Sequence, residues 1–322
     1  MKSQTVNAGR IPLNDKRIVV TGGAGFIGSN IARALCEEND VIVIDNMSTG
    51  RRENLCGLEG RIRLVECDIN DIKMLKEEFE SVDYVLHQAA LPSVQRSIMD
   101  PMTTNRSNVD GTLAVLVAAR DCGVKRVVFA SSSAVYGDSP ELPKRESSVT
   151  RPMSPYAVTK LVGEHYCRVF HEIYGLECVS LRYFNVFGPG QDPASEYAAV
   201  IPKFIDAVLS GSQPVVYGDG EQTRDFVYVK DVVRANILAC ISPRASGLAI
   251  NIGTGYATSL NRLLDAIRKI LKREIRPIYT EPRPGDVRNS VADITLAREV
   301  LGYVPEYRLE DGLREMLERL PE

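Results

Sequence analysis

The sequence predicts an α/β fold in which a doubly wound parallel sheet is joined to a smaller C-terminal α/β lobe. Three observations predict it. Over the first half of the chain, short apolar segments alternate with segments of helical periodicity. Those apolar segments are nearly continuous, which is typical of parallel strands buried on both faces. A glycine-rich turn at residues 21–28 joins the first strand to the first helix, as in dinucleotide-binding sheets.

The first half is expected to alternate strands and helices up to residue 182. The expected strands are 17–20, 41–45, 61–65, 82–87, 126–130 and 177–181. The expected helices are 26–35, 72–79, 106–122 and 155–174. Gly123 and Gly175 follow the last two helices, and glycine is the residue that most often ends a helix.

The pattern changes after Arg182, where loops lengthen and strands become short. We expect strands at 214–217, 225–229, 249–252 and 276–279, and helices at 198–209, 230–241, 259–270, 294–301 and 309–320. We therefore divide the chain into a flexible lead-in (1–16), a first domain (17–182) and a smaller substrate-binding lobe (183–322). The lobe is expected to interleave partly with the first domain, at the strand ends where open α/β sheets hold ligands.

The glycine-rich turn, Thr-Gly-Gly-Ala-Gly-Phe-Ile-Gly, carries the cofactor prediction. Glycine lets the backbone turn tightly and approach a ligand, and the helix that follows presents free N–H groups to an anion. The second strand ends in Asp45, 17 residues after Gly28. A carboxylate there accepts both hydroxyls of a ribose and repels a 2′-phosphate. Residues 17–182 are therefore predicted to form a Rossmann domain that binds NAD rather than NADP.

Composition excludes several other classes of protein. The 322 residues carry a net charge of −3, which does not indicate nucleic-acid or membrane-surface binding. No apolar run approaches the length of a membrane span, and residues 1–16 lack the apolar region of a secretory signal. The seven cysteines form no C-x-x-C pair and show no ligand spacing with the three histidines. We expect no metal site and a reducing, cytoplasmic location.

Tyr156 and Lys160 are the predicted chemical groups. Four residues apart on one helix, they share a face. The ammonium is expected to lower the pKa of the phenol, so that the phenolate takes a proton from an alcohol. Residues 131–133 are a run of three serines at the end of a strand, and a hydroxyl there can bond the oxygen of that alcohol. The residues alone leave open which serine acts.

Five segments resemble the extended short-chain dehydrogenase/reductase family. They are the glycine turn (21–28), Ser-Ser-Ser-Ala-Val-Tyr-Gly (131–137), Ser-Pro-Tyr-Ala-Val-Thr-Lys (154–160), Leu-Arg-Tyr-Phe-Asn-Val-Phe-Gly (181–188) and Arg-Pro-Gly-Asp (283–286). They occur in the family's order and cover about residues 17–303. Within the family the chain is similar to nucleotide-sugar 4-epimerases, and most similar to the branch that acts on UDP-N-acetylglucosamine.

The resemblance implies a set of site residues. Ser132 matches the family's catalytic Ser/Thr, with Ser133 as the fallback, beside Tyr156 and Lys160. The implied cofactor contacts are Gly22, Gly25, Phe26, Ile27, Gly28, Asp45, Asn46, Asp68, Ile69, Gln88, Ala89, Ala90, Asn108, Tyr156, Lys160 and Tyr183. The implied substrate contacts are Asn185, Ala199, Val200, Tyr217, Arg224, Arg283, Asp286 and Ser290. Among them Asn185, Arg224 and Arg283 are expected to hold the pyrophosphate, since the planar guanidinium pairs two oxygens at once. Tyr217 is expected to pack on the uracil.

Two departures from the family pattern bear on the sugar. Pro92 stands where glucose/galactose epimerases of the family often carry a lysine, so one cofactor contact is lost or replaced. Ser290 stands where glucose-selective members resemble one another in having a bulky tyrosine. With Ala199 on the opposite wall, a serine there leaves room for an N-acetyl group on C2.

The sequence therefore predicts an isomerase, an NAD-dependent 4-epimerase of UDP-N-acetylglucosamine and UDP-N-acetylgalactosamine. UDP-glucose and UDP-galactose are further candidates, and the reaction is expected to pass through a 4-keto sugar. A UDP-glucuronate or UDP-N-acetyl-uronate 4-epimerase is the main alternative, in which Arg96 or Arg288 meets the C6 carboxylate. A UDP-glucuronate decarboxylase is less favoured. A dTDP-glucose 4,6-dehydratase is disfavoured because residues 132–133 are serines, where members of that branch resemble one another in having an acidic pair that performs the elimination. An inactive NAD-sensing regulator is disfavoured because this chain keeps the Tyr–Lys pair.

The resemblance also implies a homodimer. The segments 106–122 and 156–174 match the helices that pair across a two-fold axis in this family. Residues 113–119 are apolar on nearly all sides, so this stretch must be buried either in the core or against a partner.

Overall fold

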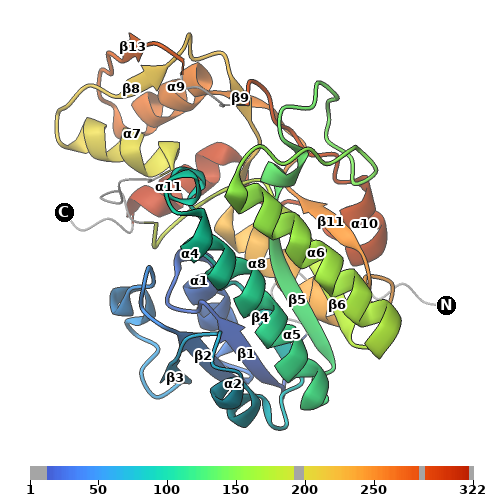
Figure 1. The fold of residues 1–322 in the computed structure, drawn as a ribbon. Coiled ribbons are helices and arrows are strands. Elements are labelled where there is room, and N and C mark those ends of the chain that lie inside the picture. Colours follow the sequence, from blue (N-terminus) through green and yellow to red (C-terminus); the bar gives the residue numbers. More distant parts are fainter. Residues whose placement is uncertain (1–12, 192–198, 283–286, 319–322) are drawn as a thin grey trace, which may run out of the picture.

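The centre of the molecule is a seven-stranded parallel sheet (Figure 1). The computed structural model describes residues 13–191, 199–282 and 287–318. The strand order is β11-β6-β5-β4-β1-β2-β3. The strands are β1 (Arg17–Thr21), β2 (Asp40–Asp45), β3 (Ile62–Glu66), β4 (Tyr84–His87), β5 (Arg126–Ser132), β6 (Glu177–Tyr183) and β11 (Ala249–Ile252). The predicted doubly wound α/β class is confirmed.

The strand order reverses direction at β1, which lies between β2 and β4. Parallel pairing aligns the carboxyl ends of the strands: Thr21 is opposite both Ile44 and His87, and Ser132 is opposite Tyr183. Ligands of open α/β sheets bind beyond such a switch point, at the carboxyl edge. The register therefore gathers the predicted site residues at one edge of the sheet.

Helices cover both faces of the sheet, and the alternation of side chains along each strand feeds two separate cores. Ile18 and Val20 of β1 pack with α1 (Phe26–Leu35), α8 (Val229–Ile241) and α10 (Thr295–Leu301). Val19, between them, packs on the other face with α2 (Ile72–Phe79), α5 (Gly111–Asp121) and α6 (Pro155–Tyr174). Strands buried on both sides explain the continuous apolar runs in the sequence.

The second lobe has a third core and lies at the top of Figure 1. Its helices are α7 (Val200–Leu209), α9 (Leu260–Leu271) and α11 (Leu309–Glu318). Its strands form three two-stranded sheets, which pair β7 (Asn185–Phe187) with β10 (Phe226–Tyr228), β9 (Thr223–Arg224) with β12 (Thr258–Ser259), and β8 (Val215–Tyr217) with β13 (Ile278–Thr280).

Three elements that follow residue 183 in the chain contribute to the main sheet and its cover. Strand β11 forms its edge beside β6, and α8 and α10 lie on one face. Arg126, the first residue of β5, secures α8. Its Nη1 donates to three carbonyls at the end of α8, those of Ala239, Cys240 and Ser242, at 2.7–2.9 Å.

The helical stretch predicted at 106–122 begins earlier and is more broken. The structure has α3 (Val94–Met99), α4 (Pro101–Asn105) and a π-helical turn, η2 (Arg106–Asp110), before α5. Side chains cap both new starts: Ser93 accepts from the Arg96 N–H and Asp100 from the Thr103 N–H, each at 3.0 Å. These are ordinary N-cap bonds, and Pro101 suits the first helical position. Two 3₁₀ turns, η1 (Arg52–Leu55) and η3 (Ser133–Tyr136), were also not predicted.

Residues 1–12 of the expected flexible lead-in lie outside the described residues. Leu13 is buried in the core, and its carbonyl accepts from the Asn39 side chain at 2.9 Å. Leu13, which the prediction assigned to the lead-in, thus packs with the first core. Over the part of the chain that is described, no helix combines the length and apolar character needed to cross a bilayer.

Candidate active site

A cavity of about 770 Å³ opens at the carboxyl edge of the sheet. It is lined by residues from the ends of β1, β2, β4, β5 and β6 and from α6. The predicted residues that line it are Gly22, Gly25, Phe26, Ile27, Gly28, Asp45, Asn46, Ile69, Gln88, Ala89, Ala90, Tyr156, Lys160, Tyr183 and Ala199. The fold therefore gathers most of the predicted cofactor contacts in one space.

The glycine turn is packed too closely for any other residue at two positions. Gly22 has a φ of +67°, and a Cβ there would lie 2.6 Å from the backbone of Ala89. A Cβ on Gly28 would lie 2.2 Å from the carbonyl oxygen of Gly22. Helix α1 begins with no side-chain cap, so its first N–H groups are left for a ligand. This cradle fits the pyrophosphate of a dinucleotide.

Asp45 ends β2 at the position expected for ribose recognition. It is buried and accepts from the N–H of Ala24 at 3.0 Å and of Met47 at 2.9 Å. Burial raises the pKa of its carboxyl, and the two hydrogen bonds act in the opposite direction. The loop beyond it, residues 47–51 with Asn54, also lines the cavity and was missed, because its sequence has no motif that indicates a ligand.

Tyr156 is half-buried and lines the cavity, with Lys160 one turn further along α6. The Lys160 ammonium donates to the carbonyl of Ala130 at 2.8 Å and lies 5.9 Å from the centre of the Tyr156 ring. Burial lowers the pKa of Lys160 to about 8. Burial also raises the pKa of Tyr156, and a hydrogen bond with Ser132 acts in the opposite direction. The predicted lowering by Lys160 is therefore wrong for the protein without cofactor, because desolvation of the phenolate is the largest effect.

The structure separates the three serines. Ser132 makes a hydrogen bond with Tyr156, which acts to lower the pKa of that phenol, and accepts from the Ala134 N–H at 3.2 Å. Ser131 lines the cavity, but its hydroxyl donates to Glu164. Ser133 begins the turn η3. Ser132 is thus the serine that contacts Tyr156.

Tyr183 joins the cavity to the helix α8. Its hydroxyl lies 3.2 Å from Gln88 Oε1 and 2.8 Å from Asn236 Nδ2. Burial raises the pKa of the Tyr183 phenol. Asn236 is fully buried and comes from the second half of the chain, so no local pattern could have identified it.

Two predicted cofactor contacts, Asp68 and Asn108, do not line the cavity. Asp68 is exposed and accepts from the side chain of Asn46, which does line the cavity, at 3.0 Å. Asn108 is buried: it bonds both backbone groups of Leu91, at 2.8 and 3.2 Å, and the Thr159 hydroxyl at 3.1 Å. Its polar atoms are occupied in holding the wall of the cavity to α6.

A second cavity, of about 480 Å³, lies in the lobe. Five predicted substrate contacts line it: Asn185, Ala199, Val200, Tyr217 and Arg224. Ala199 lines both cavities, so the two adjoin. Arg283 and Asp286 lie outside the described residues.

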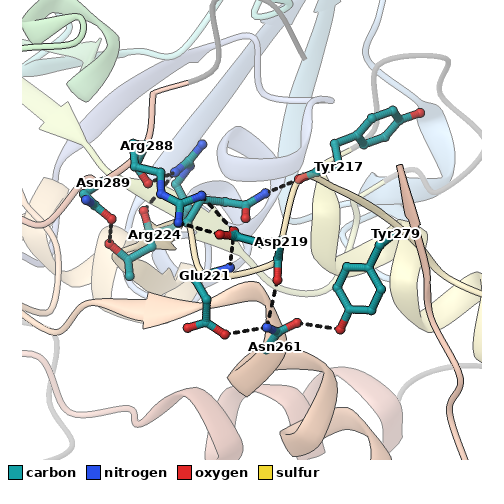
Figure 2. Close-up of polar contacts among 10 residues, drawn as sticks. Tyr217, Asp219, Glu221, Arg224, Asn261, Tyr279, Arg288 and Asn289 are labelled. Carbon is teal, nitrogen blue, oxygen red and sulfur yellow. Dashed lines mark hydrogen bonds and ion pairs between the residues drawn. The ribbon is translucent and has the colours of Figure 1, made fainter. Parts of the chain in front are cut away.

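The loop that carries Tyr217 and Arg224 is held by a polar cluster (Figure 2). Arg288 donates to both oxygens of Asp219, at 2.7 and 2.8 Å, and holds the pKa of that carboxyl below its usual range. Asn261 donates to the Asp219 carbonyl at 3.1 Å and accepts from the Tyr279 hydroxyl at 2.9 Å. In Figure 2 the Tyr217 ring points away from this cluster.

Two residues predicted near the sugar are placed differently from our expectation. Ser290 lines neither cavity, and its N–H donates to the carbonyl of Thr223 at 3.1 Å. Arg288 is committed to Asp219. Arg96, from α3, does line the first cavity. Within the described ranges no group of three or more His, Cys, Asp or Glu side chains is placed to hold a metal ion.

Known proteins closely resemble this chain. Its residues 18–253 match the NAD dependent epimerase/dehydratase family. A putative UDP-glucose 4-epimerase of Methanocaldococcus jannaschii is 43% identical over 93% of this chain and 97% of that protein. The UDP-glucose 4-epimerase of Mycolicibacterium smegmatis is 41% identical over 94% of this chain and 97% of that protein.

Solved structures agree in fold. The UDP-N-acetylglucosamine 4-epimerase of Methanobrevibacter ruminantium, in complex with UDP-N-acetylmuramic acid, has a TM-score of 0.92 and 45% identity, covering 95% of this chain and 98% of that one. The UDP-glucuronic acid 4-epimerase of Bacillus cereus, with UDP-glucuronic acid and NAD, has a TM-score of 0.86 and 32% identity, covering 94% and 98%. The NAD prediction and the family resemblance are confirmed: the chain belongs to the NAD dependent epimerase/dehydratase family and is an NAD-dependent isomerase.

Proposed function

We propose that this isomerase inverts C4 of a UDP-sugar, with UDP-N-acetylglucosamine and UDP-N-acetylgalactosamine as its substrate pair. One observation carries the proposal. Tyr156, with Ser132 bonded to it and Lys160 one turn away, lies in the cavity that fits a dinucleotide, and that cavity adjoins a second one lined by Tyr217 and Arg224. A sugar held between the two cavities would present its carbinol to the phenol.

In this mechanism Tyr156 takes the proton from the sugar 4-OH, and Ser132 holds that oxygen by a hydrogen bond. NAD, held by the glycine turn and Asp45, would supply the reversible hydride chemistry at C4 that inversion through a transient 4-keto sugar requires. Since burial raises the pKa of Tyr156, the phenolate needs nearby positive charge, to which the buried Lys160 contributes. Arg224 and Asn185 hold the pyrophosphate while the sugar turns over.

The choice of sugar rests on two supports. Ala199, a small residue, lines both cavities and leaves space beside the sugar. The similar protein from Methanobrevibacter ruminantium is named a UDP-N-acetylglucosamine 4-epimerase. UDP-glucose and UDP-galactose remain candidates because the relatives from two other organisms are named for glucose.

A uronate 4-epimerase is the second candidate, and one observation favours it. Arg96 lines the first cavity and is a cation that a C6 carboxylate could meet, whereas Arg288 is paired with Asp219. The Bacillus cereus neighbour acts on UDP-glucuronic acid. Substitution of Arg96→Gln separates the candidates, since it should abolish use of a uronate and leave a neutral sugar nearly unaffected.

The experiment is to incubate the purified protein separately with UDP-N-acetylglucosamine, UDP-glucose and UDP-glucuronate, and to resolve the C4 epimers by chromatography. We expect the highest kcat/KM with UDP-N-acetylglucosamine. Turnover of UDP-glucuronate alone would replace the proposal by the uronate candidate. No turnover of any of the three by protein that contains NAD would reject 4-epimerisation.

We further propose a homodimer formed by α5 and α6, in a cytoplasmic setting. Helix α6 exposes Val158 (46%) and Ile173 (68%), and the adjoining helices α3 and α4 expose Met99 (77%) and Met102 (79%). Apolar side chains gathered on one side of a molecule indicate a partner surface. Light scattering after gel filtration should give twice the 35.5 kDa mass of one chain, and a monomer would reject the dimer.

The seven cysteines are all free, which supports a reducing compartment.

A further inference from the structure

A buried ion pair lies just behind the proposed catalytic residues. Glu164 of α6 and Arg182 of β6 are both 7% exposed. Arg182 Nε lies 2.9 Å from Glu164 Oε1, and its Nη2 lies 2.7 Å from Oε2, so the contact is bidentate. Neither residue lines either cavity. The pair is therefore not placed to contact a ligand in either cavity.

Each member of the pair holds one end of the segment that carries Ser132. The Ser131 hydroxyl, immediately before Ser132, donates to Glu164 Oε1. Tyr136, at the end of the turn η3 that follows Ser132, accepts from Arg182 Nη1 at 2.8 Å, with the guanidinium 4.9 Å from its ring centre. The Tyr136 hydroxyl in turn donates to Asn251 of β11 at 2.7 Å. Ser132 thus lies between two residues, Ser131 and Tyr136, that are hydrogen-bonded to the two members of the ion pair.

The same ion pair also fixes the helix that carries the phenol. Tyr156, Lys160 and Glu164 are spaced by four residues along α6 and lie on one face. A second tie runs from Lys160 to the Ala130 carbonyl on β5. The distance between Ser132 and Tyr156 therefore depends on how α6 packs against β5 and β6. Glu164 of α6 contacts both strands, through Ser131 of β5 and Arg182 of β6.

We propose that Glu164 and Arg182 are positioning residues, which hold Ser132 and Tyr156 at the spacing needed for both to reach one substrate oxygen. This inference rests on the proposed function. A buried ion pair is not needed for stability, because well-packed apolar residues of similar volume are often as stable. An apolar pair could not make the hydrogen bonds that Glu164 and Arg182 make to Ser131 and Tyr136.

The test compares two Glu→Gln variants, each of which removes the carboxylate partner of an arginine on the β5–β6 strand pair. In Glu164→Gln we expect kcat to fall about 100-fold with KM within about 2-fold, since a small misplacement of reacting groups has an effect of that size. The matched control is Glu177→Gln, which weakens the Arg126 ion pair at the opposite end of β5 and β6. It should lower Tm and leave kcat unchanged.

A second variant covers the case in which Glu164→Gln does not fold because Arg182 is left unpaired. The double substitution Glu164→Met with Arg182→Met removes both charges, and we expect a Tm near that of the wild type together with the same loss of kcat. A folded variant with kcat within 2-fold of wild type would overturn the proposal. Tyr156→Phe is measured in parallel: if that variant stays active, the proposed function fails instead, so the two failures are distinguishable.

Discussion

The two ends of the β5–β6 strand pair each carry a buried arginine paired with a glutamate, and they serve different purposes. At the amino end, Arg126 (4% exposed) meets Glu177 (39% exposed) and caps the carbonyls of α8. At the carboxyl end, Arg182 and Glu164 are both nearly inaccessible and hold the segment around Ser132. The first pair fastens a helix to the sheet, whereas the second orients side chains at a cavity.

The carboxyl edge of the sheet also holds a group of buried titratable side chains. His87, Lys160, Glu164 and Arg182 are all buried toward the carboxyl edge, and burial lowers the pKa of His87 to about 3. Burying a titratable group costs stability unless it is bonded, and buried groups with shifted pKa values are common at functional sites. We therefore expect substitutions at the carboxyl edge to change mainly activity, and those at the amino edge to change mainly stability.

The largest effect is expected for Tyr156→Phe, which breaks the chemistry at the carboxyl edge alone. Loss of the proposed base should lower kcat about 1,000-fold. NAD content, measured by absorbance after denaturation, should match the wild type, because the ring that lines the cavity remains. Epimerisation at the wild-type rate would contradict the assignment.

The matching change at the amino edge is Arg126→Met. It leaves Glu177, two carbonyls of α8 and the carbonyl of Ser242 without their donor, so the free energy of unfolding should fall by about 3 kcal/mol in urea titrations. Below the new midpoint kcat should stay within about 2-fold of wild type. A large loss of kcat in the folded variant would remove the contrast between the two edges.

The contrast becomes sharper within the serine run. Ser132→Ala removes the hydroxyl that contacts Tyr156 and should lower kcat about 100-fold, as for other single donors at a reacting oxygen. Ser133→Ala is the matched control and should change kcat less than about 2-fold. The reverse order would assign the role to Ser133.

The smallest effect concerns pH. His87 has a pKa near 6.5 in the unfolded chain and about 3 in the folded one, so below pH 6.5 the unfolded state binds one more proton. His87 should thus contribute a loss of stability of about 1.4 kcal/mol per pH unit as pH falls from 6.5 toward 3. In His87→Gln, urea titrations between pH 6 and 4.5 should show a slope smaller by that amount. An unchanged slope would mean that His87 is not buried neutral.

Local interactions made much of the fold predictable. Helices α1, α2 and α6 have the bounds expected from the sequence, because each couples an apolar stripe to a local start or stop such as Ser154 or Gly175. Strands β5 and β6 run further than expected, to Ser132 and Tyr183. Their last residues pair with each other, and such pairing depends on a partner distant in sequence.

The same division runs through the site. The glycine turn, Asp45 and the Tyr–Lys pair, which all line the cavity, were identifiable from the sequence because their pattern is a spacing along one chain segment. Asn236 beneath Tyr183, the loop at 47–51 and the cavity position of Arg96 were not. Those placements depend on how elements distant in sequence pack together. The sequence around a polar residue in a loop or helix does not indicate which distant element it will contact.

The sequence by itself determined the sheet class, the cofactor and the helix that carries the phenol, since periodicity and fixed spacing express interactions between near neighbours. Only the tertiary structure decided the partners of the charged residues. It paired Arg182 with Glu164, Arg126 with the end of α8, and Arg288 with Asp219. The physical reason is that a charge along a chain has many possible partners, and burial and packing select among them only once the strands and helices are in place.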